Sequence, residues 1–214
     1  MHKDPLIPGE AYHIYNRANG SENLFREPDN YRYFMTKLVE RTHPVLKILA
    51  WCLMPNHFHL LIRLKDEGTI MQYNKDQDGT QSISSTIKDL SMENQAGFIV
   101  HRQLSKLMIG YAKAYNKKYK RRGSLLQQNT KRKLIDNEAY LRRVCLYIHF
   151  NPVHHGFVKH PEHWSYSSYE DYIYDYTSFI EKTELLSSFG GRSSFKDAHH
   201  QYSKAITSSS IHHS

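Results

Sequence analysis

The stretch at residues 51–64, WCLMPNHFHLLIRL, constrains the fold of this chain more than any other. Its apolar residues flank a Pro-Asn step, which is typical of a turn between two antiparallel strands. Alternate side chains of a strand share a face, so His57 and His59 lie on one face about 6.6 Å apart and Phe58 lies on the other. The stretch predicts a hairpin with one face in a hydrophobic core and one face whose histidines are candidates for a functional site.

A histidine pair of this spacing can bind one divalent metal ion. Metal-to-nitrogen distances of about 2.0 to 2.2 Å are within reach of both rings from one rigid strand. The alternative is that the two histidines are ordinary strand residues, and the rest of the chain has to distinguish these interpretations.

Length and charge restrict the class of protein. The chain has 214 residues, which fits one domain, or one domain with a tail, around a sizeable core. It carries 29 Lys+Arg against 21 Asp+Glu, a net charge of +8, which favours nucleic acid as a partner ahead of an anionic membrane.

The use of cysteine and the hydropathy of the chain indicate the cellular compartment in which we expect the protein. Cys52 and Cys145 form no CxxC motif, so we expect small buried apolar residues in a reducing environment rather than disulfide or zinc ligands. The first ten residues lack the apolar segment of a signal peptide, and the longest apolar run, residues 48–54, is too short to cross a bilayer. We expect a soluble intracellular protein.

Hydrophobic periodicity predicts an α+β fold of ferredoxin-like type, an antiparallel sheet with interleaved helices. Residues 65–91 have no clear pattern and predict a long exposed insertion with at most a short helix, and the aromatic segment 163–176 is expected to pack back on the domain. Pro152 is expected to end the helix before it. The predicted strands are 11–17, 45–54, 57–64 and 124–135, and the predicted helices are 29–41, 98–119, 138–150, 184–189 and 194–205.

The last residues, TSSSIHHS, are expected to be disordered, and His199 and His200 are interpreted as solvated residues of the same tail.

Basic residues are concentrated between residues 113 and 143, where eleven Lys/Arg stand against two acidic residues. A solvated face is one explanation, and a surface that binds phosphates is the favoured one. The candidates for nucleic-acid binding are Lys113, Lys117, Lys118, Lys120, Arg121, Arg122, Lys131, Arg132, Lys133, Arg142 and Arg143.

The helix at 138–150 offers a nucleophile and a third metal ligand. Tyr147 and Asn151 are four residues apart and share a helical face, and the amide oxygen of Asn151 can complete a two-histidine metal shell. Tyr111, Tyr115 and Tyr119 are alternative nucleophiles beside a basic run, although their spacing matches a buried stripe.

Four further histidines are candidates for contacts with metal or DNA. His13 lies on the first strand, and His154 and His155 precede a glycine where a phosphate can bind. His149 is two positions from Tyr147 and therefore points to another side of the helix, so a surface or packing role is favoured.

Three motifs in order, YHIYNRANG, HFHLL after MPN, and YIHFNPVHHGFV, resemble the single-tyrosine HUH transposases, most closely the repeat-associated tyrosine transposases. The resemblance covers residues 10–170. It implies an HUH endonuclease domain over residues 1–170, including the insertion at 65–91, and a helical extension with a disordered tail over residues 171–214.

The resemblance also implies roles. Tyr147 falls on the nucleophile, and His57, His59 and Asn151 fall on the ligands of Mg²⁺ or Mn²⁺; many relatives have glutamine in place of Asn151, and both side chains supply an amide oxygen. The implied reaction cuts and rejoins single-stranded or hairpin DNA through a 5′-phosphotyrosine link, as monomer or homodimer, with no membrane or small-molecule substrate, in a bacterial cytoplasm and at the nucleoid when bound to DNA.

Two other functions stay open from the residues alone. One is a domesticated protein that binds hairpin DNA or RNA without cutting it. The other is a metal hydrolase that uses a metal-bound water, with Tyr147 in a structural role.

Overall fold

A single four-stranded sheet organises the protein, and the computed structural model describes residues 4–77, 91–176 and 179–211. All neighbouring strands are antiparallel, in the order β2-β3-β1-β4. In chain order the elements are β1 (Ala11–Arg17), α1 (Pro28–Thr42), β2 (Leu46–Met54), β3 (His57–Leu64), α2 (Glu67–Asp76), α4 (Met92–Lys118), β4 (Lys131–Ile135), α5 (Glu138–His154), the 3₁₀ turn η1 (Pro161–His163), α6 (Tyr169–Tyr174), α7 (Lys182–Phe189) and α8 (Arg192–Ile211).

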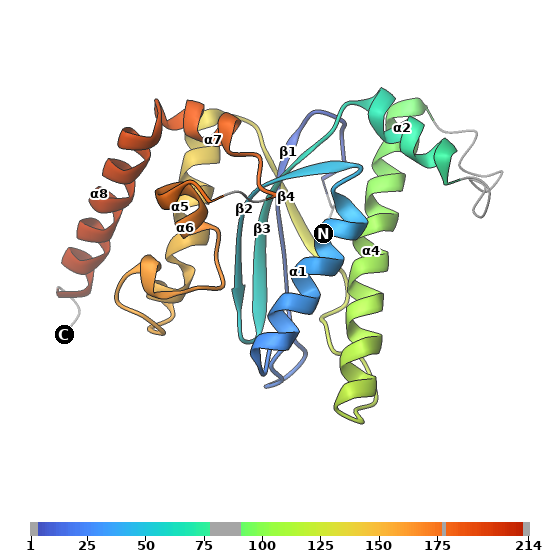
Figure 1. The fold of residues 1–214 in the computed structure, drawn as a ribbon, viewed down its shortest axis with the longest axis horizontal. Helices are drawn as coiled ribbons and strands as arrows, with labels where there is room; N and C mark the ends of the chain where they lie inside the picture. Colours follow the sequence, from blue (N-terminus) through green and yellow to red (C-terminus); the bar gives the residue numbers. More distant parts are fainter. Residues whose placement is uncertain (1–3, 78–90, 177–178, 212–214) are drawn as a thin grey trace.

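The topology confirms the predicted ferredoxin-like fold. Helix α1 connects β1 to β2 across β3, and α4 connects β3 to β4 across β1, which gives two interlocked β-α-β units. Helices α1 and α4 cover one face of the sheet, while α5 to α8 lie on the other side (Figure 1).

The two faces of β3 differ as the hairpin pattern predicts. Phe58 packs against Phe34 of α1, with ring centroids 5.2 Å apart, and Phe34 packs against Tyr111 of α4 at 5.1 Å. His57 and His59 therefore point to the opposite face, which α5 approaches.

The turn of the β2–β3 hairpin is tied to the segment that follows β1. The carbonyl oxygen of Asn56 accepts a hydrogen bond from the amide of Ala18 at 2.8 Å, and that of Pro55 accepts one from Phe25 at 2.9 Å. These bonds hold in place the end of the hairpin from which His57 projects.

Two element boundaries between the third and fourth strands differ from the prediction. The predicted strand 124–135 is wrong over its first half, because Gly123 and Asn129 have positive φ angles of 85° and 69°, which interrupt extended backbone. The insertion at 65–91 contains a short helix, as the prediction allowed: α2 has ten residues and is capped by Asp66, whose side chain accepts a hydrogen bond from the amide of Thr69 at 2.8 Å. Residues 78–90 of that insertion lie outside the described residues, and α4 begins at Met92 rather than at residue 98.

The prediction that Pro152 ends the preceding helix is wrong, since α5 continues to His154. A proline removes one helical hydrogen bond, and the last turn is instead held by the amide of His155, which donates to Asn151 at 3.1 Å, and by that of Phe157, which donates to Pro152 at 2.9 Å. Gly156, with φ of 70°, follows the helix end.

The C-terminal helices pack more tightly than the sequence indicates. His199 is buried in α8, with its ring 4.1 Å from that of Phe195, so its interpretation as a solvated residue is wrong, whereas His200 is exposed. Helix α8 runs to Ile211, so the expected disorder of the tail is wrong for residues 207–211; residues 212–214 lie outside the described part.

The segment 163–176 packs back on the domain, as predicted: the amide of Leu53 donates to the carbonyl of Tyr166 at 2.9 Å, and the ring of Tyr166 stacks on that of Tyr31 at 3.6 Å. Within the described ranges, no helix combines the length and apolarity needed to span a bilayer.

Two glycines of α4 provide a test of how the N-terminal segment packs. A methyl group on Gly97 would overlap the carbonyl oxygen of Leu6, whereas one on Gly110 meets nothing within 4 Å. We expect Gly97→Ala to lower the free energy of unfolding in urea by about 1–3 kcal/mol through overpacking. Gly110→Ala, the matched control, is expected to raise it by about 0.5–1 kcal/mol through helix propensity. A Gly97→Ala protein as stable as Gly110→Ala would contradict this packing.

Candidate active site

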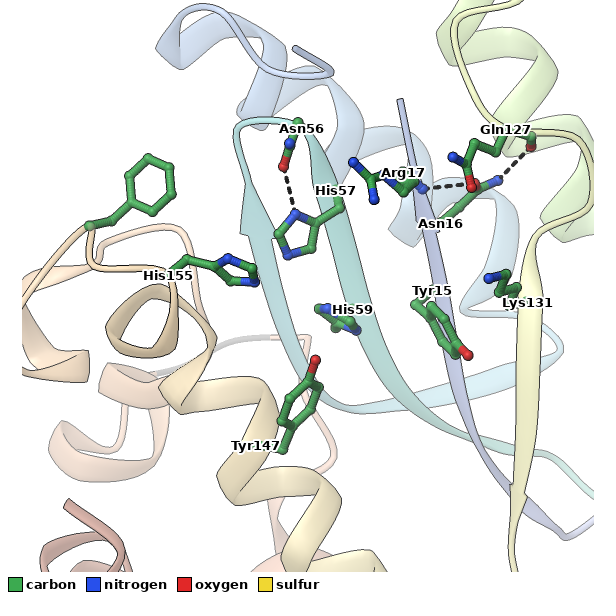
Figure 2. Close-up of a pocket in the computed structure, with 11 residues that line it drawn as sticks. Tyr15, Asn16, Arg17, Asn56, His57, His59, Gln127, Lys131, Tyr147 and His155 are labelled. Carbon is green, nitrogen blue, oxygen red and sulfur yellow. Dashed lines mark hydrogen bonds between the residues drawn. The ribbon is translucent and has the colours of Figure 1, made fainter. Parts of the chain in front are cut away.

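The candidate site is a pocket of about 310 Å³ on the sheet face that carries the β3 histidines (Figure 2). Its walls come from β1, β3, β4 and α5, from the turn between β2 and β3, and from the segments that precede β4 and follow α5. The lining residues are Tyr15, Asn16, Arg17, Asn56, His57, His59, Gln127, Lys131, Tyr147, His155 and Phe157.

The histidine pair has the arrangement predicted from strand alternation. The rings of His57 and His59 have centroids 5.2 Å apart and lie edge to face. Burial is the main cause that lowers the pKa of both imidazoles, that of His59 well below its ordinary value. Both rings are therefore neutral at pH 7 and offer a nitrogen lone pair.

His13 of β1 orients His59. Its Nε2 lies 2.9 Å from Nδ1 of His59, so the two rings share one hydrogen bond. When Nδ1 of His59 donates in this bond, the lone pair of its Nε2 atom can bind a metal ion. Burial, with a smaller effect of Lys133, lowers the pKa of His13 to about 4, which keeps this partner neutral as well.

His57 lies between two asparagine side chains. Its Nδ1 is 2.7 Å from Oδ1 of Asn56, and its Nε2 is 2.8 Å from Oδ1 of Asn151. A neutral imidazole has one N–H group, so when Nδ1 donates to Asn56, the lone pair of Nε2 faces the amide oxygen of Asn151.

This arrangement fits a divalent metal ion. Two lone-pair donors about 2.0–2.2 Å from one ion lie about 3 Å apart when they meet it near a right angle, which matches His57 and Asn151. Asn151 is fully buried behind the pocket wall, and its amide nitrogen has no hydrogen-bond partner among the described residues. The exposed ring of His155, 5.0 Å from that of His57, is a further nitrogen donor inside the pocket.

Tyr147 projects from α5 into the pocket, with its hydroxyl directed toward His59 (Figure 2). Its ring lies 5.4 Å from that of His59 and 6.1 Å from that of His13, and 38% of the residue is exposed. The hydroxyl is therefore accessible to a substrate beside the histidine pair.

The alternative tyrosines, two on α4 and one at its C-terminal cap, lie on the opposite face of the sheet. The hydroxyl groups of Tyr111 and Tyr115 donate to the carbonyl oxygens of Leu24 and Asn23 at 2.5 and 2.6 Å. That of Tyr119 contacts the side chain of Glu27 at 2.8 Å. Burial raises the pKa of all three, so none of them resembles an accessible nucleophile.

The three predicted DNA-binding residues of β4 do not all point to the same face of the sheet. Lys131 and Lys133 pair with Tyr15 and His13 of β1, and so share the face of the pocket. Arg132, between them, points to the other face, where its guanidinium donates to the carbonyl oxygen of Asp4 at 2.5 Å.

The cations on the pocket face lie beside aromatic rings. The Lys131 ammonium is 5.9 Å from the ring centroid of Tyr15, and the Lys133 ammonium is 5.4 Å from that of Tyr140. The Arg143 guanidinium lies 4.9 Å from the same Tyr140 ring. Together these five residues, Tyr15, Lys131, Lys133, Tyr140 and Arg143, form what we term the cationic track.

Other predicted DNA-binding residues have structural partners. Arg121 pairs with Glu22 at 2.8 Å, Lys118 pairs with Glu27, and Arg142 donates to the carbonyl of Ser188 at 2.7 Å. The remaining four are exposed on α4 or in the segment after it, and the structure does not bring them into the pocket lining: Lys113, Lys117, Lys120 and Arg122.

Three residues in or beside the pocket could not be identified as functional from the local sequence. His13 was one of several candidate histidines, and only the β1–β3 pairing brings it to His59. Asn56 was interpreted as a turn residue, yet its side chain also holds His57. Phe157 closes the pocket from the segment after α5.

The sheet order is that of a ferredoxin-like fold, and α5 places Tyr147 opposite His59 of the third strand. A solved structure described as the REP-associated tyrosine transposase bound to a REP hairpin is similar over 86% of this chain and 92% of that chain. The two chains are 15% identical and superpose with a TM-score of 0.55, which establishes a shared fold. No protein-family model and no curated protein matches this chain.

Buried neutral histidines make stability depend on pH. Burial lowers the pKa of His13, His59, His149 and His199, so below the ordinary value of about 6.5 the unfolded chain binds more protons than the folded one. We expect the free energy of unfolding to fall between pH 6.5 and 5, by up to about 1.4 kcal/mol per pH unit for each histidine.

Urea denaturation in chelator at several pH values measures this dependence. Most carboxyl groups stay ionised above pH 5 and contribute little to it. His13→Phe should make the slope shallower, and His160→Phe, at an exposed position, should leave it as in the wild type. A free energy of unfolding that is constant from pH 7.5 to 5 would contradict the burial of neutral histidines.

Proposed function

We propose that this chain is a metal-dependent single-strand DNA endonuclease and strand transferase that acts through a covalent 5′-phosphotyrosine link. The observation that carries the proposal is the accessible hydroxyl of Tyr147, directed at His59 across the pocket (Figure 2). The fold shared with a transposase that binds a hairpin supports it.

Tyr147 is the proposed nucleophile. Its phenol, of ordinary pKa about 10, loses its proton as the oxygen bonds to phosphorus, the bond from phosphorus to the 3′ oxygen breaks, and that oxygen takes up a proton. The DNA is left with a free 3′-hydroxyl and a 5′ phosphate on Tyr147. Because this ester retains the energy of the broken bond, a 3′-hydroxyl of another strand can reverse the step, and rejoining requires no ATP.

The histidines and Asn151 are the proposed metal ligands. Mg²⁺ or Mn²⁺ held by His57, His59 and Asn151 would supply positive charge beside the scissile phosphate. His13 and Asn56 act as positioning residues. Their hydrogen bonds to the Nδ1 atoms of His59 and His57, respectively, orient the two rings.

Single-stranded DNA is the proposed substrate. The cationic track runs across the pocket face, where lysine and arginine can neutralise backbone phosphates while Tyr15 and Tyr140 offer faces on which bases stack. A hairpin that presents an unpaired strand end would suit the same surface, and the hairpin bound by the similar transposase favours this form of substrate.

Covalent trapping tests the nucleophile. With a labelled hairpin oligonucleotide carrying a single-stranded flank, and Mg²⁺ or Mn²⁺, we expect a protein–DNA adduct that survives denaturation. Tyr147→Phe should reduce adduct formation by about 10³-fold or more, because no other group replaces the lost oxygen. Tyr115→Phe, which removes a buried hydroxyl on the other face, is the matched control and should form the adduct at nearly the wild-type rate.

The other outcomes identify the alternative functions. Binding without an adduct in the wild type would support a non-cleaving hairpin-binding protein. Cleavage that survives Tyr147→Phe would support a hydrolase that uses a metal-bound water.

Three consecutive residues of β4 test the cationic track. Lys131→Ala and Lys133→Ala should each weaken binding to single-stranded DNA about 3- to 10-fold in 0.1 M salt and reduce the slope of log affinity against log salt by about 0.7. Arg132→Ala removes the same charge from the opposite face and should change affinity less than about 2-fold. Equal losses in all three variants, measured by fluorescence anisotropy, would show that net charge rather than this surface governs binding.

A further inference from the structure

Three potential metal ligands meet between α5 and α8, away from the candidate active site. Cys145 and His149 are four residues apart on one face of α5, and His199 projects from α8. Their ligand atoms all lie within 4.8 Å of one another: Nδ1 of His149 is 3.7 Å from the Cys145 sulfur and 2.9 Å from Nε2 of His199. Ligands with bonds of about 2.0–2.3 Å to one tetrahedral ion lie about 3–4 Å apart, and the two distances from His149 are close to this range.

The cluster is sealed from solvent. Cys145 and His149 are 0% exposed and His199 is 2% exposed, and aromatic side chains such as Phe195 surround them. Polar groups in an apolar interior reduce stability unless a partner compensates them. Burial lowers the pKa of both histidines and so keeps their nitrogen lone pairs available.

In each of the two imidazoles, the nitrogen that faces away from the cluster has a hydrogen-bond partner, as in histidines that bind metal ions. Nδ1 of His199 donates to the carbonyl oxygen of Phe195 at 2.8 Å, which leaves the Nε2 lone pair directed into the cluster. Nε2 of His149 lies 2.8 Å from the hydroxyl oxygen of Ser168, which is 3.3 Å from the carbonyl oxygen of Trp51. This hydroxyl can accept from His149 while it donates to Trp51, so the Nδ1 atom of His149 can also be a lone-pair donor.

We propose that Cys145, His149 and His199 bind a thiophilic metal ion, Zn²⁺ or Cu⁺, which links α8 to α5. A thiolate with two imidazoles selects these ions over Mg²⁺ or Mn²⁺, which prefer oxygen ligands. Binding releases the thiol proton of Cys145 and moves the ring proton of His149 from Nδ1 to Nε2. The ion fastens His199 of α8 to α5, the helix that carries Tyr147, through His149, which is 50 positions away in sequence. This site is independent of the proposed function.

Cobalt substitution tests the sulfur ligand, because thiolate-bound Co²⁺ has a charge-transfer absorption band that nitrogen or oxygen ligands do not produce. The chain has two cysteines, both buried, so Cys52→Ala is the matched control. We expect one equivalent of Co²⁺ to produce the band in the wild type and in Cys52→Ala, where the sulfur must be that of Cys145, and no band in Cys145→Ala. Absence of the band from Cys52→Ala, or its persistence in Cys145→Ala, would overturn the proposal.

Two further measurements test the link to α8 and identify the ion. His199→Phe, an aromatic replacement in an aromatic environment, should weaken Co²⁺ binding at least about 10-fold, and an unchanged affinity would overturn the role of α8. The double variant His57→Ala/His59→Ala should retain the band, which separates this site from the pocket. Zn²⁺ and Cu⁺, added separately under anaerobic conditions at 100 times Kd, should raise Tm by about 5–10 °C for the ion that the site prefers, and no increase with either would contradict the site.

Discussion

The pleat of β3 is the constraint on which the rest of this structure depends. Because its side chains alternate, Phe58 packs into the core under α1 and α4 while His57 and His59 face α5. A slip of one residue in the pairing with β1 would exchange these faces, and burial of an imidazole pair in place of a phenyl ring would strongly oppose it. The hydrogen bonds from Ala18 and Phe25 to the hairpin turn fix the same register from outside the sheet.

Helix α5 connects the sheet to the C-terminal helices, and its faces have different tasks. Tyr147 faces the pocket and His59 of β3, whereas Cys145 and His149 face α8. The bonds that carry the helix past Pro152 keep Asn151 on the helix, one turn after Tyr147, where its amide reaches His57. One helix therefore supplies the nucleophile of the proposed reaction and a candidate ligand of its metal ion. The same helix contacts α8 through His149.

The sequence predicted the sheet, the hairpin and the main helices because local periodicity and turn residues determine them. Strands β1 and β3 lie where alternation indicated, and β2 lies where a continuous apolar run indicated. It did not predict the environment of side chains that depend on distant partners. The run Lys131–Lys133 looks uniform in sequence, and pairing with β1 sends Arg132 to the far face. His199 looks like a tail residue because its partner His149 lies 50 positions away, on α5, and meets it only when α8 folds against that helix. Pro152 was expected to stop a helix that capping bonds from later residues in fact extend.

The most direct test of the account is diffraction from crystals soaked in Mn²⁺, recorded at the manganese absorption edge. The account predicts an anomalous peak bonded to the ring nitrogens of His57 and His59, with the amide oxygen of Asn151 as a further ligand and the hydroxyl of Tyr147 on its open side. A fully soaked crystal with no manganese at these imidazoles, or with Tyr147 turned away from the ion, would contradict the central claim that this tyrosine and a metal act on one phosphate.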